Sequence, residues 1–227
     1  MRALSFIFSC NPLFHCRIYR IIVAVGGIVC ILEQALSQEI GSYKTITSGT
    51  FQNTAIWAVW DGSLWVAATT KPNASTDIYI DQTHTVTLSG NEEAKSVFIN
   101  AETGAGQKLN LNSFNLDVYG SLHAFAGPAP GTPGNAWNSQ NWIGNSVRST
   151  LTFKGSSRTL VEKNSWSAQT TQSRSSVIFE ADPGELFLIE SPFKALSFTV
   201  RSGAVLQKVD TSVSPNVCFT LSFNTET

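Results

Sequence analysis

The feature that most constrains the fold is a short-range alternation of apolar side chains, which begins near Asp77 and continues to the end of the chain. Pairs of apolar residues separated by one position recur: Ile78 and Ile80, Val86 and Leu88, Val97 and Ile99, Leu109 and Leu111, Leu116 and Val118, Leu151 and Phe153, Val177 and Phe179, Leu186 and Leu188, and Leu196 and Phe198. This spacing places both side chains on one face of a strand, and no stretch keeps a helical period. The sequence predicts an all-β protein.

An internal repeat refines this prediction. The segment "KSVFINAETGA" (95–105) aligns without gaps on "KALSFTVRSGA" (194–204), and 19 residues separate both Val97 from Leu116 and Val177 from Leu196. A recurrence of this length is typical of a parallel β-solenoid, in which successive coils cover one another's apolar faces. A β-sandwich with turn signals every 8–12 residues or so is the alternative.

The first 37 residues have a different character. Arg17 and Arg20 precede the apolar run 21–32, and the small residues Ala35 and Ser37 follow it. Charge, a short apolar core and small terminal residues are typical of a secretory signal peptide, cleaved here between Ser37 and Gln38. The run is too short for a transmembrane helix, which needs about 20 apolar residues. We therefore expect a secreted or outer-surface protein with no membrane span after cleavage.

Composition excludes several classes of function. Three of the four cysteines lie in the leader, so Cys218 alone remains, and neither an internal disulfide nor a cysteine metal cage is possible. Without the leader the chain has 12 basic and 15 acidic residues and no basic tract. This balance does not suit a nucleic-acid partner. We also find no phosphate loop or nucleophile elbow, and expect no catalytic residue, metal or cofactor.

The tryptophan-rich stretch "IWAVWDGSLWVAA" (56–68) predicts a β-hairpin. Asp61-Gly62 favours a two-residue type I′ turn. One face of the hairpin would then be wholly apolar, and the other would be mixed: Trp57, Val59, Leu64 and Val66 against Ala58, Trp60, Ser63 and Trp65. We expect the apolar face to cover the open end of the first coil, which makes 38–76 an N-terminal cap.

Four tryptophans are candidate carbohydrate ligands. Trp60 and Trp65 share the second face of the hairpin, where they could stack on a sugar or pack under a loop. Trp137 and Trp142 lie in the proline- and glycine-rich segment 127–145, which predicts a loop projecting from the coils. There they could anchor a partner or fold back onto the coil wall.

The polar candidates have simpler interpretations. His84 has the same parity as Val86 and Leu88, which predicts a half-buried structural histidine. The acidic segment "EADPGE" (180–185) contains Pro183-Gly184 and predicts a solvated turn rather than a cation site. A β-helix lyase or hydrolase would need carboxylates and a basic residue on one face of successive coils.

The stretch from Ser48 to Leu88 carries a family resemblance. It contains Ser48-Gly49, Phe51 and Trp57, then Pro72, and then "DIYIDQTHTVTL" (77–88), and "FTVRSGAVLQKVD" (198–210) adds a strand-glycine-alanine-strand pattern. In these motifs the chain resembles secreted and cell-surface proteins of Bacteroidetes. The resemblance implies a right-handed parallel β-helix with an N-terminal cap, and export, often by the type IX route. It carries over no catalytic residues.

The C-terminal stretch "VCFTLSF" (217–223) alternates as one more strand would, with Val217, Phe219, Leu221 and Phe223 on one face. Only four residues follow it. Proteins of the resembled family commonly continue into further domains, so we expect coils over 77–227 that are truncated at their C-terminal end. An open last coil predicts self-association.

Together these features predict an exported, non-enzymatic surface or matrix protein, a structural or adhesive β-helix segment of a larger protein, with polysaccharide or other matrix components as partners. A carbohydrate-active β-helix enzyme and a carbohydrate-binding module are the alternatives.

Overall fold

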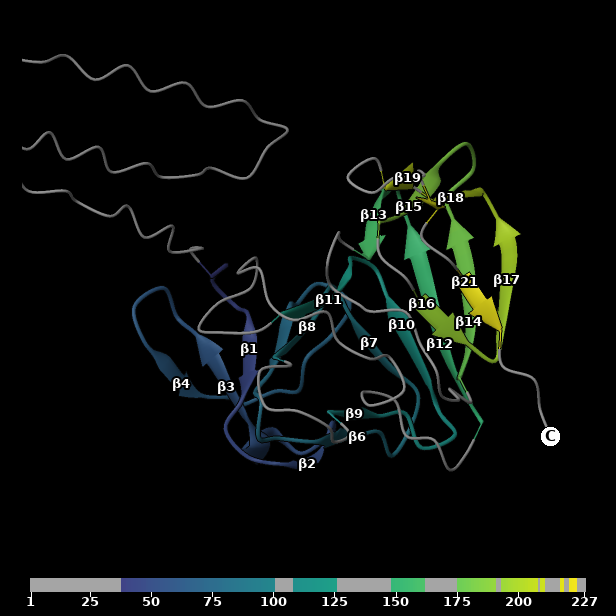
Figure 1. Cartoon of the computed structure of the whole chain (residues 1–227). Coiled ribbons are helices and arrows are strands. Elements are labelled where there is room, and N and C mark those ends of the chain that lie inside the picture. The colour runs from purple at the N-terminus through teal and green to yellow at the C-terminus, as the bar shows by residue number, and fades with distance from the viewer. Residues whose placement is uncertain are drawn as a thin grey trace, which may run out of the picture. The chain divides into compact units, whose positions relative to one another are not determined.

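The computed structural model describes residues 38–100, 108–125, 148–161, 175–190, 193–207, 209–210, 217–218 and 221–223. All of them belong to one compact unit, Gln38–Thr227. Their regular structure is β-strand apart from one short 3-10 helix, η1 (Thr54–Ile56) (Figure 1). The prediction of an all-β protein is confirmed.

Four sheets contain most of the strands, and each is built mainly from parallel neighbours. The six-stranded sheet has the order β11 (Leu122–Phe125), β8 (Val97–Asn100), β5 (Ile78–Ile80), β1 (Tyr43–Thr45), β3 (Trp57–Trp60) and β4 (Trp65–Ala67). The five-stranded sheet has the order β17 (Ser197–Ser202), β14 (Ser175–Ala181), β12 (Ser149–Gly155), β10 (Asn115–Val118) and β7 (Glu92–Ala94). Two three-stranded sheets contain β2 (Gly49–Thr50), β6 (Val86–Thr87) and β9 (Leu109–Asn110), and β13 (Arg158–Val161), β15 (Leu186–Ile189) and β18 (Ala204–Gln207).

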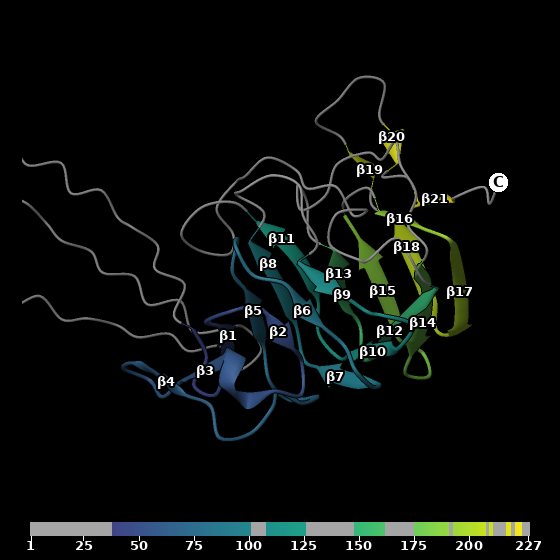
Figure 2. The same cartoon turned by 90° about the horizontal axis from the view of Figure 1, so that it is seen from below.

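The chain visits these sheets in rotation. Strands β5, β6 and β7 belong to three different sheets. Strands β8, β9 and β10 then join the same three sheets in the same order, and they pair parallel with β5, β6 and β7 respectively. Figure 2 shows β5, β8 and β11 of the six-stranded sheet side by side. The parallel pairing already begins with β1 and β2, inside the segment 38–76 that the sequence assigns to the cap.

The core is a single cluster enclosed by these sheets. The alternating pairs from Ile78 and Ile80 to Val177 and Phe179 all point into it, and each of these side chains is at most 1% exposed. Phe153 and Phe179 stack at 5.9 Å between ring centroids, so neighbouring strands repeat the same kind of side chain inward. The inward positions predicted for these strands are confirmed.

The prediction for β15 is wrong by one residue. Leu186 is exposed and Leu188 is only partly buried, whereas Phe187 and Ile189 fill the core. In "LFLI" the residues on both faces of the strand are apolar, so alternation alone cannot identify the face that points inward. Packing decides it, because the Phe187 ring lies 6.4 Å from that of Phe179.

The internal repeat does not mark equivalent positions. Val97 and Ile99 lie in β8 of the six-stranded sheet, whereas Phe198 lies in β17 of the five-stranded sheet. The true steps between residues paired in parallel vary, from 18 residues between Leu186 and Ala204 to 37 between Gly49 and Val86. Connections of unequal length separate the strands, and this conceals the repeat in the sequence.

The hairpin register also differs from the prediction. Trp60 pairs with Trp65, and Val59 with Val66, so the turn spans four residues rather than two. The Asp61 carboxylate closes this turn by accepting the backbone N–H groups of Ser63 and Leu64, both at 2.7 Å. Because the register shifts by an even number, Trp57, Val59 and Val66 still share one face. Leu64 leaves it and is exposed in the turn.

Trp57 is buried in the core, as predicted, but the predicted cover by the whole apolar face is wrong, because Val66 on that face is 43% exposed. Its side chain is fully buried, its indole N–H donates to the Phe51 carbonyl at 2.9 Å, and Tyr43 and Phe51 contact it edge-on. Trp60 and Trp65 are only partly buried, which confirms the predicted order of exposure.

Two pieces of the predicted C-terminal strand are described. β20 (Val217–Cys218) pairs antiparallel with β19 (Val209–Asp210), and β21 (Leu221–Phe223) pairs parallel with β16 (Phe193–Ala195). The residues that join the two pieces lie outside the described residues, so the single strand expected over 217–223 stays a prediction. Phe219 lies outside the described residues.

Candidate functional site

A shallow groove of about 260 Å³ lies on the outer face of the five-stranded sheet. Four adjacent parallel strands contribute its lining, which is almost entirely polar: Asn115 and Asp117 from β10, Thr150, Thr152 and Lys154 from β12, Ile178 and Glu180 from β14, and Arg201 from β17. We call this surface the sheet groove.

Strand alternation positions these side chains. Asp117 lies between the buried Leu116 and Val118, and Glu180 lies between Phe179 and Ala181, which also point inward. Every second residue must then face outward, because successive side chains alternate across a strand. The same periodicity that builds the core therefore aligns the outward polar residues of neighbouring strands.

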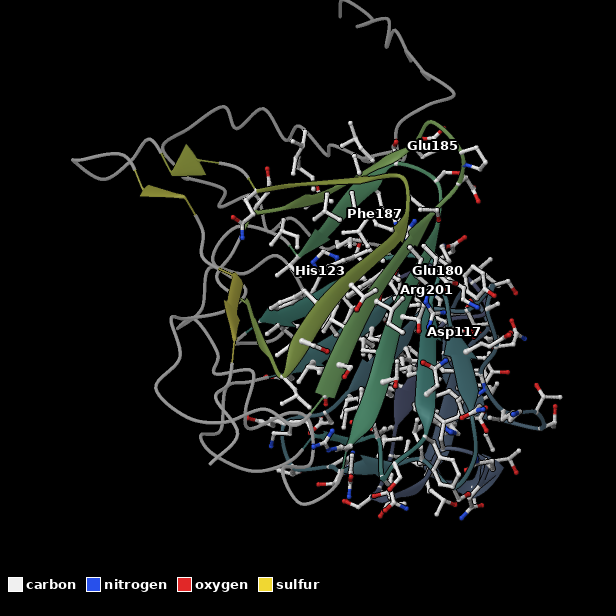
Figure 3. All side chains as sticks on the ribbon, turned by 90° about the vertical axis from the view of Figure 1, so that its right-hand side faces the viewer. Asp117, His123, Glu180, Glu185, Phe187 and Arg201 are labelled. Carbon is white, nitrogen blue, oxygen red and sulfur yellow. The ribbon has the colours of Figure 1, made fainter. Side chains whose placement is uncertain are left out.

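The charged residues form an alternating ladder across the four strands. Lys154 Nζ lies 2.6 Å from Asp117 Oδ2 and 3.8 Å from Glu180 Oε2, and Arg201 Nη1 lies 2.5 Å from Glu180 Oε1. Figure 3 shows Asp117, Glu180 and Arg201 near one another on the same side of this sheet. The two carboxylates and two cations balance, so the ladder as a whole carries no formal charge.

Lys154 is the centre of this ladder. The hydrogen bond that Lys154 donates to Asp117 is the main reason that the pKa of Lys154 lies above its ordinary value, and burial opposes this shift. A lysine with a raised pKa stays protonated at neutral pH and is a poor general base. Lys154 is therefore suited to holding acceptor groups rather than to removing a proton.

The neutral residues of the groove are also ordered. Thr152 donates to Asn115 Oδ1 at 2.9 Å, and Asn115 in turn donates from Nδ2 to Asp117. Arg201, at the other end, has a side chain that is 57% exposed, and its Nη1 is the group that contacts Glu180. The groove thus combines fixed hydrogen-bonding groups with one exposed guanidinium.

The hairpin tryptophans come together but not as an open platform. The rings of Trp60 and Trp65 lie 5.4 Å apart at 54°, and Lys44 Nζ lies 4.6 Å from the centre of the Trp65 ring. Lysine therefore occupies one face of Trp65, which a sugar would need for stacking. Trp137 and Trp142, the other two predicted ligand residues, lie outside the described residues.

A second row of rings lies on the outer face of the six-stranded sheet. Tyr79, Phe98 and His123 occupy directly paired positions on β5, β8 and β11. Their rings stack at 4.7 and 5.0 Å, both with an interplanar angle of 9°. The faces of these rings pack against one another, so the row stabilises the sheet rather than offering a surface on which a sugar could stack.

The remaining predicted positions agree with their structural interpretations. His84 is half-buried, and its Nδ1 lies 2.9 Å from Thr45 Oγ1. In the acidic segment, Asp182 and the two following residues are exposed in a turn, and Glu185 accepts the Ser157 N–H at 2.9 Å. Within the described residues, no group of three or more histidine, cysteine or acidic side chains could hold a metal ion.

Sequence reasoning missed Asp117, Lys154 and Arg201, and placed Glu180 only in an acidic turn segment. Asp117 and Glu180 each lie between two apolar residues, and this is the signal that an outward strand position leaves. Lys154 and Arg201 have an apolar residue on one side only. The pairing of β10, β12, β14 and β17 brings them together, and neither pairing nor register can be obtained from one sequence.

No family model, curated protein or solved structure matches this chain. In the part of the chain that the structure describes, no helix has the length and apolar character that a membrane crossing requires.

Proposed function

We propose that this chain is a right-handed parallel β-helix, part of an exported surface or matrix protein, and that it binds a polysaccharide along the sheet groove without turning it over. The rotation of the chain through successive parallel sheets supports the β-helix over the sandwich, whose strands pair antiparallel. The family resemblance and the leader support export to the cell surface, by the type IX route.

The observation that carries the binding proposal is the ladder of Asp117, Lys154, Glu180 and Arg201 across four parallel strands. A straight, shallow surface with regularly spaced donors and acceptors suits an extended polymer with many hydroxyl groups. The ion pairs fix the side chains in place before a ligand arrives, which lowers the entropic cost of binding.

The same ladder favours binding over catalysis. A hydrolase needs one carboxyl group that can give up a proton and a second that is free to act as base or nucleophile. Here Lys154 contacts both carboxylates, and its raised pKa keeps it cationic. The carbohydrate-active enzyme stays an outcome of the test below, because both carboxylates do lie on one face of the same sheet, on β10 and β14.

Affinity electrophoresis of the Gln38–Thr227 unit in gels containing neutral or acidic polysaccharides tests the proposal. We expect retardation in at least one gel, and loss of it in the double variant Lys154→Ala, Arg201→Ala. Glu93→Gln, on the exposed face of β7 outside the groove, is the matched control and should bind as the original chain does.

Two results would replace the proposal. Release of shortened chains that stops in Asp117→Asn or Glu180→Gln would favour the carbohydrate-active enzyme. Retardation that survives the groove variants but is lost in Trp60→Ala or Trp65→Ala would favour a carbohydrate-binding module on the hairpin. A chain that no polysaccharide retards would leave the groove without a ligand of this class.

A further inference from the structure

The charges of the sheet groove alternate in sign from strand to strand. In the order of the sheet, Asp117 lies on β10, Lys154 on β12, Glu180 on β14 and Arg201 on β17. The two cations are therefore two strands apart, and so are the two carboxylates. Because neighbouring strands lie about 4.8 Å apart, strand positions of one sign repeat at about 9.6 Å across the groove.

The register brings three of these side chains into one row. Lys154 pairs directly with Glu180. The register between β14 and β17 then shifts by one residue, so Ser202 pairs with Glu180 and Arg201 is the extra residue. An extra residue of this kind re-aims the side chains around it. Asp117 belongs to the neighbouring row and reaches Lys154 diagonally.

Both cations keep donors for a ligand. Lys154 lies 2.6 Å from Asp117 but 3.8 Å from Glu180, so at most two of its three N–H groups face carboxylates. Within the described part of the chain, Arg201 contacts Glu180 through Nη1 alone, which leaves its Nε and Nη2 donors for an anion. The two carboxylates, in contrast, offer acceptors only.

We propose that the polymer in the sheet groove carries a carboxylate on every second sugar. This inference rests on the proposed function and specifies the class of polysaccharide. A sugar in an extended chain advances by a length similar to one strand spacing, so a chain that crosses the strands places successive sugars over successive strands. Acidic sugars over β12 and β17 accept from Lys154 and Arg201. The neutral sugars between them donate hydroxyl groups to Asp117 and Glu180.

The alternation of signs discriminates against two other classes of polymer. A chain with a carboxylate on every sugar would place half of them beside Asp117 and Glu180, and like charges in contact weaken binding. A neutral chain offers the cations only hydroxyl and ring oxygens, so it lacks the bidentate pairing of a guanidinium with a carboxylate. Without the leader the chain has 12 basic and 15 acidic residues, so its net charge does not attract polyanions in general.

Affinity electrophoresis of the Gln38–Thr227 unit with three linear polymers tests this proposal. Hyaluronate has a carboxylate on every second sugar, carboxyl-reduced hyaluronate is the same chain without the charge, and polymannuronate has a carboxylate on every sugar. We expect the dissociation constant for hyaluronate to be about tenfold lower than for either of the others, as one hydrogen bond between charged groups allows. The original chain gives this ranking, which therefore does not depend on the folding of a variant.

Variants test whether the preference arises in the groove. Arg201→Gln should remove most of the advantage of hyaluronate over its carboxyl-reduced form. Lys44→Gln removes a positive charge from the six-stranded sheet instead and should leave that advantage unchanged. Glu180→Gln should strengthen the binding of polymannuronate, because it removes a carboxylate that repels this polymer. Glu93→Gln removes the same charge outside the groove and should not.

The outcomes separate this inference from the proposed function. Equal binding of hyaluronate and its carboxyl-reduced form overturns the inference alone, and so does polymannuronate bound as tightly as hyaluronate. A preference for hyaluronate that Arg201→Gln leaves intact, or that Lys44→Gln removes, also contradicts it. If another polysaccharide retards the chain and hyaluronate does not, the inference fails and the proposed function stands. If no polysaccharide retards the chain, both fail.

Discussion

At the scale of single residues, Trp57 is the largest fully buried side chain among the described residues. It makes a buried hydrogen bond to Phe51 as well as two edge-on ring contacts. We expect Trp57→Ala to lower the free energy of unfolding by about 3–5 kcal/mol, as large-to-small core substitutions do. Trp60→Ala should cost clearly less, since Trp60 is only partly buried. Urea denaturation of both variants measures the difference, and a larger loss for Trp60→Ala would contradict the observed faces.

Asp77 gives the chain a pH-dependent stability. Burial raises the pKa of Asp77, and the attraction of Lys95 only partly opposes this. Its Oδ1 is buried with no hydrogen-bond partner among the described residues. Because the folded pKa exceeds the unfolded value of about 3.9, the folded chain holds more protons just above that pH, and stability falls as the pH rises through this window.

Asp77→Asn removes this ionisation. We expect the variant to be more stable than the original chain at neutral pH, and this advantage to shrink as the pH falls toward about 4. Thermal melts of both proteins across this range are the measurement. An advantage that grows as the pH falls would show that the carboxylate is stabilised, rather than penalised, by its surroundings.

At the scale of elements, the connection between β4 and β5 fastens the N-terminal edge of the five-stranded sheet. Lys71, in this connection, donates to the buried Glu92 of β7. Lys71→Met removes a charged hydrogen-bond donor from the buried Glu92 carboxylate and should lower the free energy of unfolding by about 1–3 kcal/mol. Glu93→Gln, exposed on the same strand, should change little. Chemical denaturation of both variants decides, and equal losses would mean that the connection is held by other contacts.

The same scale shows where sequence reasoning succeeds and fails. Inward faces were predictable wherever apolar and polar residues alternate, as in β10 and β12. The prediction failed in "LFLI" because both parities are apolar, and in the hairpin because Asp61 closes a longer turn with its carboxylate. The register of a strand depends on its neighbouring strand as well as on its own pattern of apolar residues. For this reason Asp117 and Arg201, 84 positions apart in the sequence, could not be grouped in advance.

For the whole molecule, the order of the strands in the sheets predicts a gradient of local stability. In an array of stacked strands, each strand is stabilised mainly by its neighbours, so strands with two partners should open less often than edge strands. We expect amide hydrogen exchange to be slowest in β8, β10, β12 and β14, which have a partner strand on both sides, and fastest in the edge strands β17 and β18. Trp57→Ala should accelerate exchange in β1 and β5 before it affects β14. Hydrogen exchange followed by mass spectrometry of peptides resolves these strands, and uniform protection from β5 to β18 would mean that the unit opens only as a whole.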